Sequence, residues 1–132
     1  PVSGDDPQQI YEAAYGLLLQ QEYGAAQQAF ADFVGKFSKH ALAGNAQYWL
    51  GETYYVRGQY KDAAGAFLAG YRKFAASAKA PDSLLKLAMS LDRLGQKSAA
   101  CSSLGELGAK FPGAPSHVKR RALQEQRRLR CK

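Results

Sequence analysis

The sequence predicts an all-α fold in which three helical hairpins stack into a superhelix and one further helix caps the C-terminal end. Two observations support this fold class. Similar residues recur at an interval of 37 positions, and within each interval apolar residues recur every three or four positions, the period of a helix. The 132 residues, 46% hydrophobic and 22% charged, suit one domain with a continuous core.

The repeat aligns residues of like size three times. The aligned small residues are Ala14, Gly51 and Ala88, then Ala26, Ala63 and Ala100; the aligned large residues are Leu17, Tyr54 and Leu91, then Phe37, Phe74 and Phe111. Because a side chain larger than Ala would push two crossing helices apart, we expect the two small sets to face each other within each hairpin. The phenylalanines are expected to fill the space between hairpins, since no hairpin buries its apolar face alone.

The individual helices follow from this spacing and from their end signals. They are expected at about 7–20, 23–37, 42–57, 60–75, 81–94, 97–111 and 115–130. Asp6 is expected to cap the first helix ahead of a proline, and Pro81 and Pro115 to open later helices. Gly58 and Gly95 are expected to end helices in the left-handed conformation.

The domain boundaries follow from the helix grouping. Repeats are expected at about 7–41, 42–78 and 79–114, followed by a capping helix over 115–130. Residues 1–6 read as the remnant of a linker, so we expect the chain to be part of a longer protein.

The net charge of +7 is concentrated at the C-terminal end. Residues 117–132 contain seven Lys or Arg residues against one acid, Glu125. Two interpretations remain open: a solvated outer face on the last helix, or a surface for phosphates or acidic partners. The segment has no aromatic residue, so nucleic-acid binding is not predicted. No apolar run approaches the roughly 18 residues of a membrane span.

The second repeat resembles the tetratricopeptide pattern. The matching residues are Leu50, Gly51, Tyr54, Gly58, Tyr60, Ala63 and Phe67. Gln47 departs from the pattern, because an aromatic residue is usual at its position. The 37-residue interval exceeds the usual repeat of about 34. It therefore implies a longer turn between hairpins.

Two segments, residues 45–55 and 79–88, are similar to one family in particular, the Tol-Pal system protein YbgF, also called CpoB. The resemblance covers about residues 8–130. It implies a periplasmic, non-catalytic domain that binds TolA and a bifunctional penicillin-binding protein. Such a domain coordinates peptidoglycan synthesis with outer-membrane constriction during cell division. It also implies an upstream coiled coil that trimerises the whole protein, with this domain itself monomeric. The alternative is a scaffold module of an outer-membrane assembly lipoprotein or another envelope complex.

In a tetratricopeptide stack the first helix of each pair lines the concave face, which gives a candidate binding groove. Its expected residues are Tyr11, Tyr15, Asn45, Tyr48, Glu52, Tyr55, Met89, Asp92 and Arg93. Tyrosine offers a large contact area with a hydrogen-bonding tip, and an asparagine amide both donates to and accepts from a peptide backbone. Some of these tyrosines could instead only cover the packing of the hairpins.

The remaining reactive side chains predict no catalysis, cofactor or metal site. Glu52 and Asp92 are the only candidate pair of acids, and we expect them to contact a partner or Arg93. Two cysteines are too few for a zinc site. In an oxidising periplasm, Cys101 and Cys131 are expected to form a disulfide, because the end of the capping helix should lie beside the start of the preceding one. The alternative is a buried Cys101 and a free Cys131.

Overall fold

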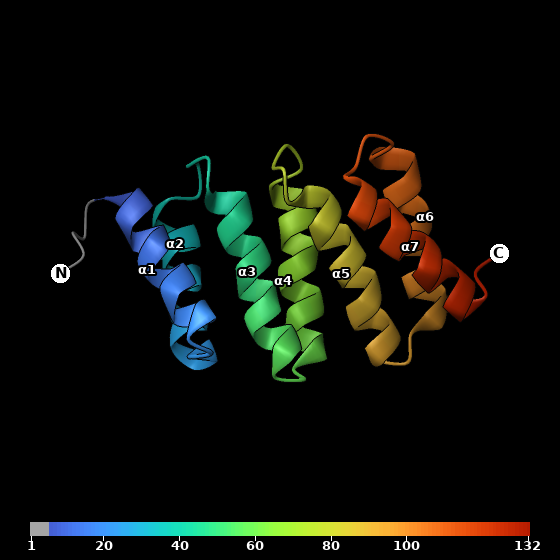
Figure 1. The fold of residues 1–132 in the computed structure, drawn as a ribbon, viewed down its shortest axis with the longest axis horizontal. Coiled ribbons are helices and arrows are strands. Elements are labelled where there is room, and N and C mark those ends of the chain that lie inside the picture. The colour runs from blue at the N-terminus through green and yellow to red at the C-terminus, as the bar shows by residue number, and fades with distance from the viewer. Residues whose placement is uncertain (1–5) are drawn as a thin grey trace.

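The computed structural model describes residues 6–132, and the part it describes is all-α, as predicted. The helices are α1 (Pro7–Leu19), α2 (Tyr23–Lys36), α3 (Ala43–Val56), α4 (Tyr60–Lys73), α5 (Ala80–Arg93), α6 (Lys97–Lys110) and α7 (Ser116–Leu129). Figure 1 shows them side by side in chain order, as three hairpins and a closing helix. Residues 1–5 of the expected linker lie outside the described residues. Asp6 caps α1 as predicted, accepting from the backbone of Gln8 and Gln9.

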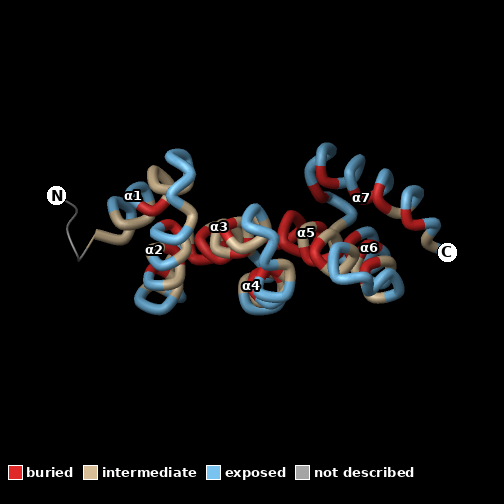
Figure 2. The backbone as a smooth tube through the Cα atoms, turned by 90° about the horizontal axis from the view of Figure 1, so that it is seen from below, coloured by how far each residue is buried: buried red, intermediate tan, exposed pale blue. Residues whose placement is uncertain are grey.

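The helices form two layers. The first helices of the hairpins lie on one side with α7, and the second helices α2, α4 and α6 lie on the other (Figure 2). Because α1 and α7 rise at either end of α3 and α5, the odd-numbered helices enclose a concave face. Over residues 6–132, no helix combines the length and the apolar character needed to cross a bilayer.

The turn inside each hairpin is built in one way. Backbone carbonyls of Leu17, Tyr54 and Leu91 each accept a hydrogen bond at 2.9 Å from the residue five positions on. This is the bond that closes a Schellman turn, and it requires a left-handed residue just before the donor. Gly58 and Gly95 take that role with φ of +76° and +78°, as predicted. In the first hairpin the same place is held by Gln21, with φ of +62°.

The small residues of the repeat are buried, but one of them has a different neighbour from the one expected. Ala14, Ala26, Ala63 and Ala100 are completely buried, and Ala88 is 2% exposed.

Gly51 was expected to admit the backbone of the facing helix. Instead, a Cβ built there would lie 2.5 Å from Cε1 of Phe67. The ring of the aromatic residue therefore fills the space at Gly51, and a larger side chain would collide with that ring.

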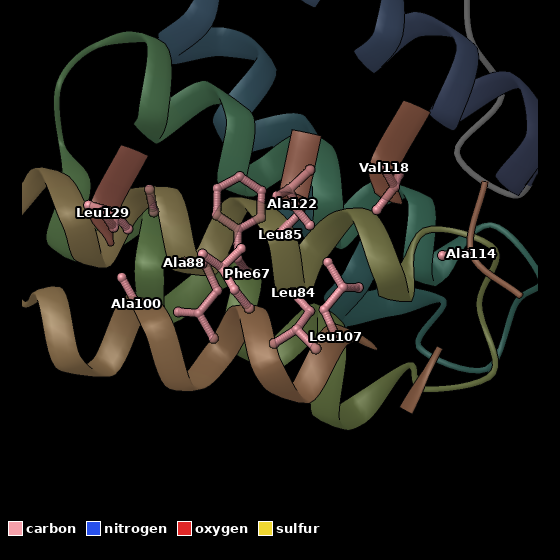
Figure 3. Packing of buried hydrophobic residues seen from close by; sticks show 13 residues of the cluster. Phe67, Leu84, Leu85, Ala88, Ala100, Leu107, Ala114, Val118, Ala122 and Leu129 are labelled. Carbon is pink, nitrogen blue, oxygen red and sulfur yellow. The ribbon is translucent and has the colours of Figure 1, made fainter. Parts of the chain in front are cut away.

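The buried side chains form two clusters, one in each half of the stack. Phe30 and Phe33 lie in the N-terminal cluster, and Phe67 lies in the C-terminal cluster beside Leu84 and Ala88 (Figure 3).

The three phenylalanines that close the repeats all lie at helix C-caps. Their φ values are −125°, −124° and −128° for Phe37, Phe74 and Phe111. Pro115 precedes α7 as its N-cap residue, one position earlier than the role expected for it.

Candidate functional site

The N-terminal part of the concave face is aromatic. The Tyr11 ring packs edge-on against Phe30 and Phe33, with ring centroids 5.9 and 5.8 Å apart. The Tyr15 ring packs against the Trp49 indole at 5.4 Å. These contacts link α1 to α2 and to the next hairpin. Tyr11 and Tyr15 therefore pack between helices, which is the alternative to partner binding that the sequence left open for them.

The Tyr11 hydroxyl is also engaged. Trp49 Nε1 donates a hydrogen bond of 3.0 Å to it, and the Asn45 side chain shares this hydroxyl. Burial raises the pKa of Tyr11, which keeps the hydroxyl protonated as a donor. Asn45 and Tyr11, predicted as separate contacts for a partner, thus lie in one polar junction between the first two hairpins.

Tyr48 lies at the middle of the face and covers the core. Its ring packs against Phe67 at 5.7 Å, and Lys79 Nζ lies 5.0 Å from its ring centroid. Burial, with the nearby charge of Glu52, strongly raises the pKa of Tyr48. The Tyr48 ring thus packs against Phe67 and also has the ammonium group of Lys79 over it.

Tyr55 is half-buried and lies two helical turns beyond Tyr48 on α3. Its ring contacts that of Tyr60 at 5.2 Å, and Lys86 Nζ lies only 4.1 Å from its centroid. Burial raises the pKa of Tyr55, and the charge of Arg93 opposes this effect. Lys86 Nζ also lies 2.8 Å from Oε1 of Glu52. Of the two contacts expected for Glu52, a partner or Arg93, the second is not seen, because Lys86 on α5 is the cation that pairs with Glu52.

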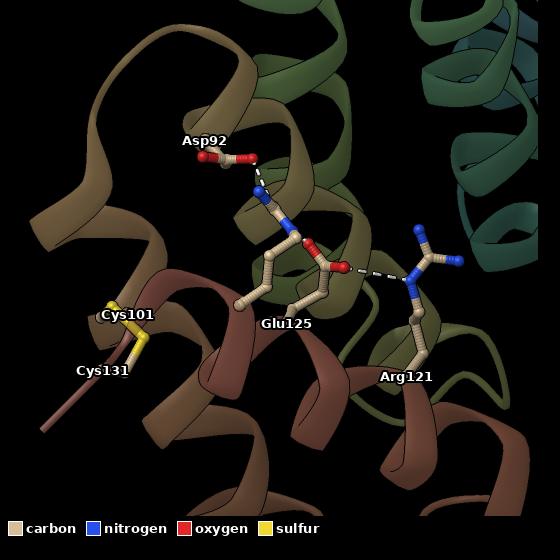
Figure 4. A network of polar contacts seen from close by, with 6 residues as sticks. Asp92, Cys101, Arg121, Glu125 and Cys131 are labelled. Atoms are coloured by element: carbon tan, nitrogen blue, oxygen red, sulfur yellow. Dashed lines mark hydrogen bonds and ion pairs between the residues drawn. A yellow bond between two sulfur atoms is a disulfide. The ribbon is translucent and has the colours of Figure 1, made fainter.

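The C-terminal part of the face is a charged pocket of about 230 Å³ between α3, α5 and α7. Its lining residues are Tyr55, Met89, Asp92, Arg93, Arg121, Glu125 and Arg128. Arg128 donates to Asp92 at 2.5 Å and to Glu125 at 2.7 Å, and Arg121 donates to Glu125 at 3.3 Å (Figure 4). The pKa of Glu125 is lowered, and the largest cause is the hydrogen bond from Arg128.

Asp92 was expected to contact a partner or Arg93, and in the structure it pairs with Arg128 and not with Arg93. The guanidinium of Arg93 lies over the Tyr60 ring, 4.7 Å from the centroid. Stacking leaves the edge of the planar guanidinium available for a carboxylate or a backbone carbonyl. The pocket thus places an arginine without a carboxylate contact, among the described residues, beside Met89 and Tyr55.

The sequence reasoning missed the contribution of α7 to this face. When α5 and α7 are aligned at their first residues, Ala80 and Ser116, Glu125 corresponds to Met89 and Arg128 to Asp92. The 37-residue interval hides this match, because the connection before α7 is one residue shorter. The expected helix starts at 81 and 115 also miss this match, because they lie 34 residues apart whereas the observed starts lie 36 apart.

The two cysteines meet away from the groove. Cys101 near the start of α6 and Cys131 after α7 are joined by a disulfide, with their Cα atoms 5.4 Å apart (Figure 4). The bond ties the closing helix to the last hairpin. Within the described residues, no group of three or more His, Cys, Asp or Glu side chains is arranged to hold a metal ion.

Comparisons with known proteins agree with this architecture. Residues 82–114 match the family model of the tetratricopeptide repeat. Two curated proteins of Pseudomonas putida, both named cell division coordinator CpoB, are 46% identical to this chain over 48 residues. The aligned stretch is 36% of this chain and 18% of each relative. These matches support a tetratricopeptide repeat domain of the CpoB type, a class of protein-interaction domain.

Proposed function

We propose that this chain is a non-catalytic adaptor domain whose concave groove holds a segment of a partner protein during cell division. The main support is that α3, α5 and α7 bring the Tyr55 ring, Met89 and several charged side chains to one concave pocket. Such a surface offers contact area from the rings and orientation from the charges. The similarity to cell division coordinators supports the cellular process.

Within the groove, Tyr55, Met89 and Arg93 are the proposed central contacts. All three line the pocket, and neither Tyr55 nor Arg93 has a hydrogen bond to another described side chain that a partner would have to break. Tyr48 is proposed to contribute its outer face, since its inner face covers Phe67. Tyr11, Tyr15 and Asn45 are proposed as the rim that shapes the other end of the groove.

The proposed partners are TolA and a bifunctional penicillin-binding protein, and the proposed location is the periplasm. Both follow from the family resemblance, in which the adaptor coordinates peptidoglycan synthesis with outer-membrane constriction. The disulfide between Cys101 and Cys131 suits an oxidising compartment. We further propose that this domain is monomeric and that the whole protein trimerises through an upstream coiled coil.

Isothermal titration calorimetry with the purified periplasmic part of TolA tests the proposal. Tyr55→Ala should weaken binding at least about fivefold, or about 1 kcal/mol, because it removes an aromatic contact at the pocket centre. Tyr48→Ala combined with Tyr55→Ala should weaken it further. Circular dichroism of each variant checks that the helices are retained.

Tyr23→Ala is the matched control, because Tyr23 opens α2 in the outer layer. It should leave the affinity unchanged. If the folded double variant binds TolA with wild-type affinity, the concave groove is not the binding site. Absence of any TolA binding by the wild-type chain would instead favour a scaffold of another envelope complex, such as an outer-membrane assembly lipoprotein.

A further inference from the structure

A second candidate surface lies outside the concave groove, between α6 and α7 at the C-terminal end of the stack (Figure 1). A cavity of about 360 Å³ opens there, and most of its lining is apolar. The apolar side chains that line it are Leu104, Leu107, Phe111, Ala114, Ala122 and Leu123.

The repeat explains why this flank of α6 is open. On α4 the corresponding flank carries Leu68, which packs on the C-terminal cluster, and Tyr71, whose ring contacts Phe111 of the next hairpin at 5.9 Å. The residues 37 positions on are Gly105 and Gly108. A Cβ built at either glycine would meet nothing within 4 Å. At these two positions α6 therefore carries no side chain where α4 packs on its neighbours, and the space beside it is open.

The flank of α7 that lines the cavity also differs from the corresponding flanks of α3 and α5. Leu123 is the eighth residue of α7, as Leu50 is of α3 and Leu87 is of α5. Leu50 and Leu87 lie in the hydrophobic clusters, whereas Leu123 is 47% exposed. The ninth residue, small in α3 and α5, is Gln124 in α7. A leucine at a core position thus faces the open cavity.

The charged side chains that line the cavity and one adjoining pocket have one sign. Lys119 lines the cavity itself, and an adjoining pocket that shares Gly105 is lined by Lys97, Arg130 and Lys132. Among the described residues that line these two pockets, none is acidic. A second copy of this chain docked through the same face would bring like charges together, which is unfavourable. Charge complementarity selects an acidic occupant instead.

We propose that the α6–α7 groove binds an acidic amphipathic helix of a partner protein, which takes the place of the second helix of a fourth hairpin. Its apolar stripe, at intervals of three and four residues, packs on Leu107, Phe111 and Leu123. The glycines of α6 let its backbone approach closely. Its flanking carboxylates face Lys119 and Arg130. This interaction is independent of the concave groove.

A synthetic 18-residue helical peptide tests the proposal by fluorescence anisotropy on the full 132-residue chain. The peptide carries Leu along one stripe and Glu on both flanks, and a second peptide carries Lys in place of every Glu. The Glu peptide should bind at least about tenfold more tightly than the Lys peptide, and its affinity should fall as salt rises.

Gly105→Leu should reduce binding of the Glu peptide by about tenfold or more, since the new side chain fills the groove. The fold should tolerate it because the position is open. Gly65→Leu is the matched control: it lies on α4, is equally open and should leave binding unchanged. Lys119→Glu should also weaken the binding of the Glu peptide.

Three outcomes would overturn the proposal. The first is equal binding of the Glu and Lys peptides, and the second is full binding by folded Gly105→Leu. The third is loss of binding in Tyr55→Ala, which would place the peptide in the concave groove. Chain that binds vesicles containing phosphatidylglycerol but not the Glu peptide would assign the surface to anionic lipid instead.

Discussion

The two ends of the concave face are held together by different physical means. At the N-terminal end, Tyr11, Tyr15 and Trp49 join the first two hairpins through ring packing and one partly buried hydrogen bond. At the C-terminal end, the partly exposed ion pair of Arg128 with Asp92 joins α7 to α5, and Glu125 on α7 pairs with the same guanidinium. Ring packing is little affected by salt, whereas exposed ion pairs are screened. The contacts at the aromatic end of the concave face should therefore be insensitive to salt, and those at the charged end should weaken as salt rises.

The difference also shows what a terminal helix requires. The closing helix α7 contributes Val118, Ala122 and Leu129 to the C-terminal cluster, with no aromatic residue among them. A helix with so little apolar area to bury has a weak hold on its neighbours. The disulfide at its end supplies the missing constraint. The comparison predicts that covalent and ionic changes affect the C-terminal end, and that changes in ring chemistry affect the N-terminal end.

The largest expected effect is loss of the disulfide. Replacing both Cys101 and Cys131 by Ser should lower the free energy of unfolding by about 3–4 kcal/mol, because the bond closes a loop with a sequence separation of 30. Urea denaturation measures the change. Titration of the denatured, non-reduced wild-type chain should find no free thiol. Two free thiols, or an unchanged urea midpoint in the double variant, would contradict the assignment.

At the aromatic end, the sharpest change is Tyr11→Phe. It keeps the ring but removes the acceptor for Trp49 Nε1, and an unsatisfied buried donor should cost about 1–2 kcal/mol. The single tryptophan reports the junction directly through its fluorescence during urea unfolding. Tyr15→Phe is the control, since no described residue hydrogen-bonds to its hydroxyl. A similar loss in both variants would show that the hydrogen bond is not the cause.

At the charged end, Glu125→Gln should give a smaller loss that depends on pH. The hydrogen bond from Arg128 lowers the folded-state pKa of Glu125 below its ordinary value of 4.5. The carboxylate therefore stabilises the fold above pH 4.5, and this contribution is lost as the pH falls through the lowered value. The variant should be less stable than wild type at about pH 7 and nearly equal to it at about pH 2. Urea midpoints at both pH values, with and without high salt, measure this; a difference that persists at the lower pH would point to packing instead.

The sequence predicted the fold well because repetition multiplies each signal. The helices lie within two residues of their expected bounds, and the left-handed Gly58 and Gly95 and the buried alanines are confirmed; each of these signals depends on local geometry or on size. The groove was harder to predict. Whether Tyr48 covers Phe67 or faces a ligand depends on how far two helices are rotated, which side-chain spacing does not fix.

Charge partners were the least predictable feature. Both Lys86 and Arg93 on α5 could pair with Glu52 by residue type, and only the relative register of the helices selects the lysine. The pairing of Asp92 with Arg128 was missed for a related reason. A one-residue difference in the connection before α7 shifts that helix out of the 37-residue register.

The smallest expected effect concerns the turn of the first hairpin, which differs from the turns of the other two. Gln21 holds the left-handed position that glycine holds at Gly58 and Gly95, and a side chain there costs roughly 1–2 kcal/mol. Glycine also gains entropy in the unfolded chain, which offsets part of this benefit. Gln21→Gly should therefore stabilise the fold by about 0.5–1 kcal/mol, seen as a higher urea midpoint. Gly58→Ala should do the reverse, and a lower midpoint in Gln21→Gly would mean that the glutamine side chain makes contacts worth more than its strain.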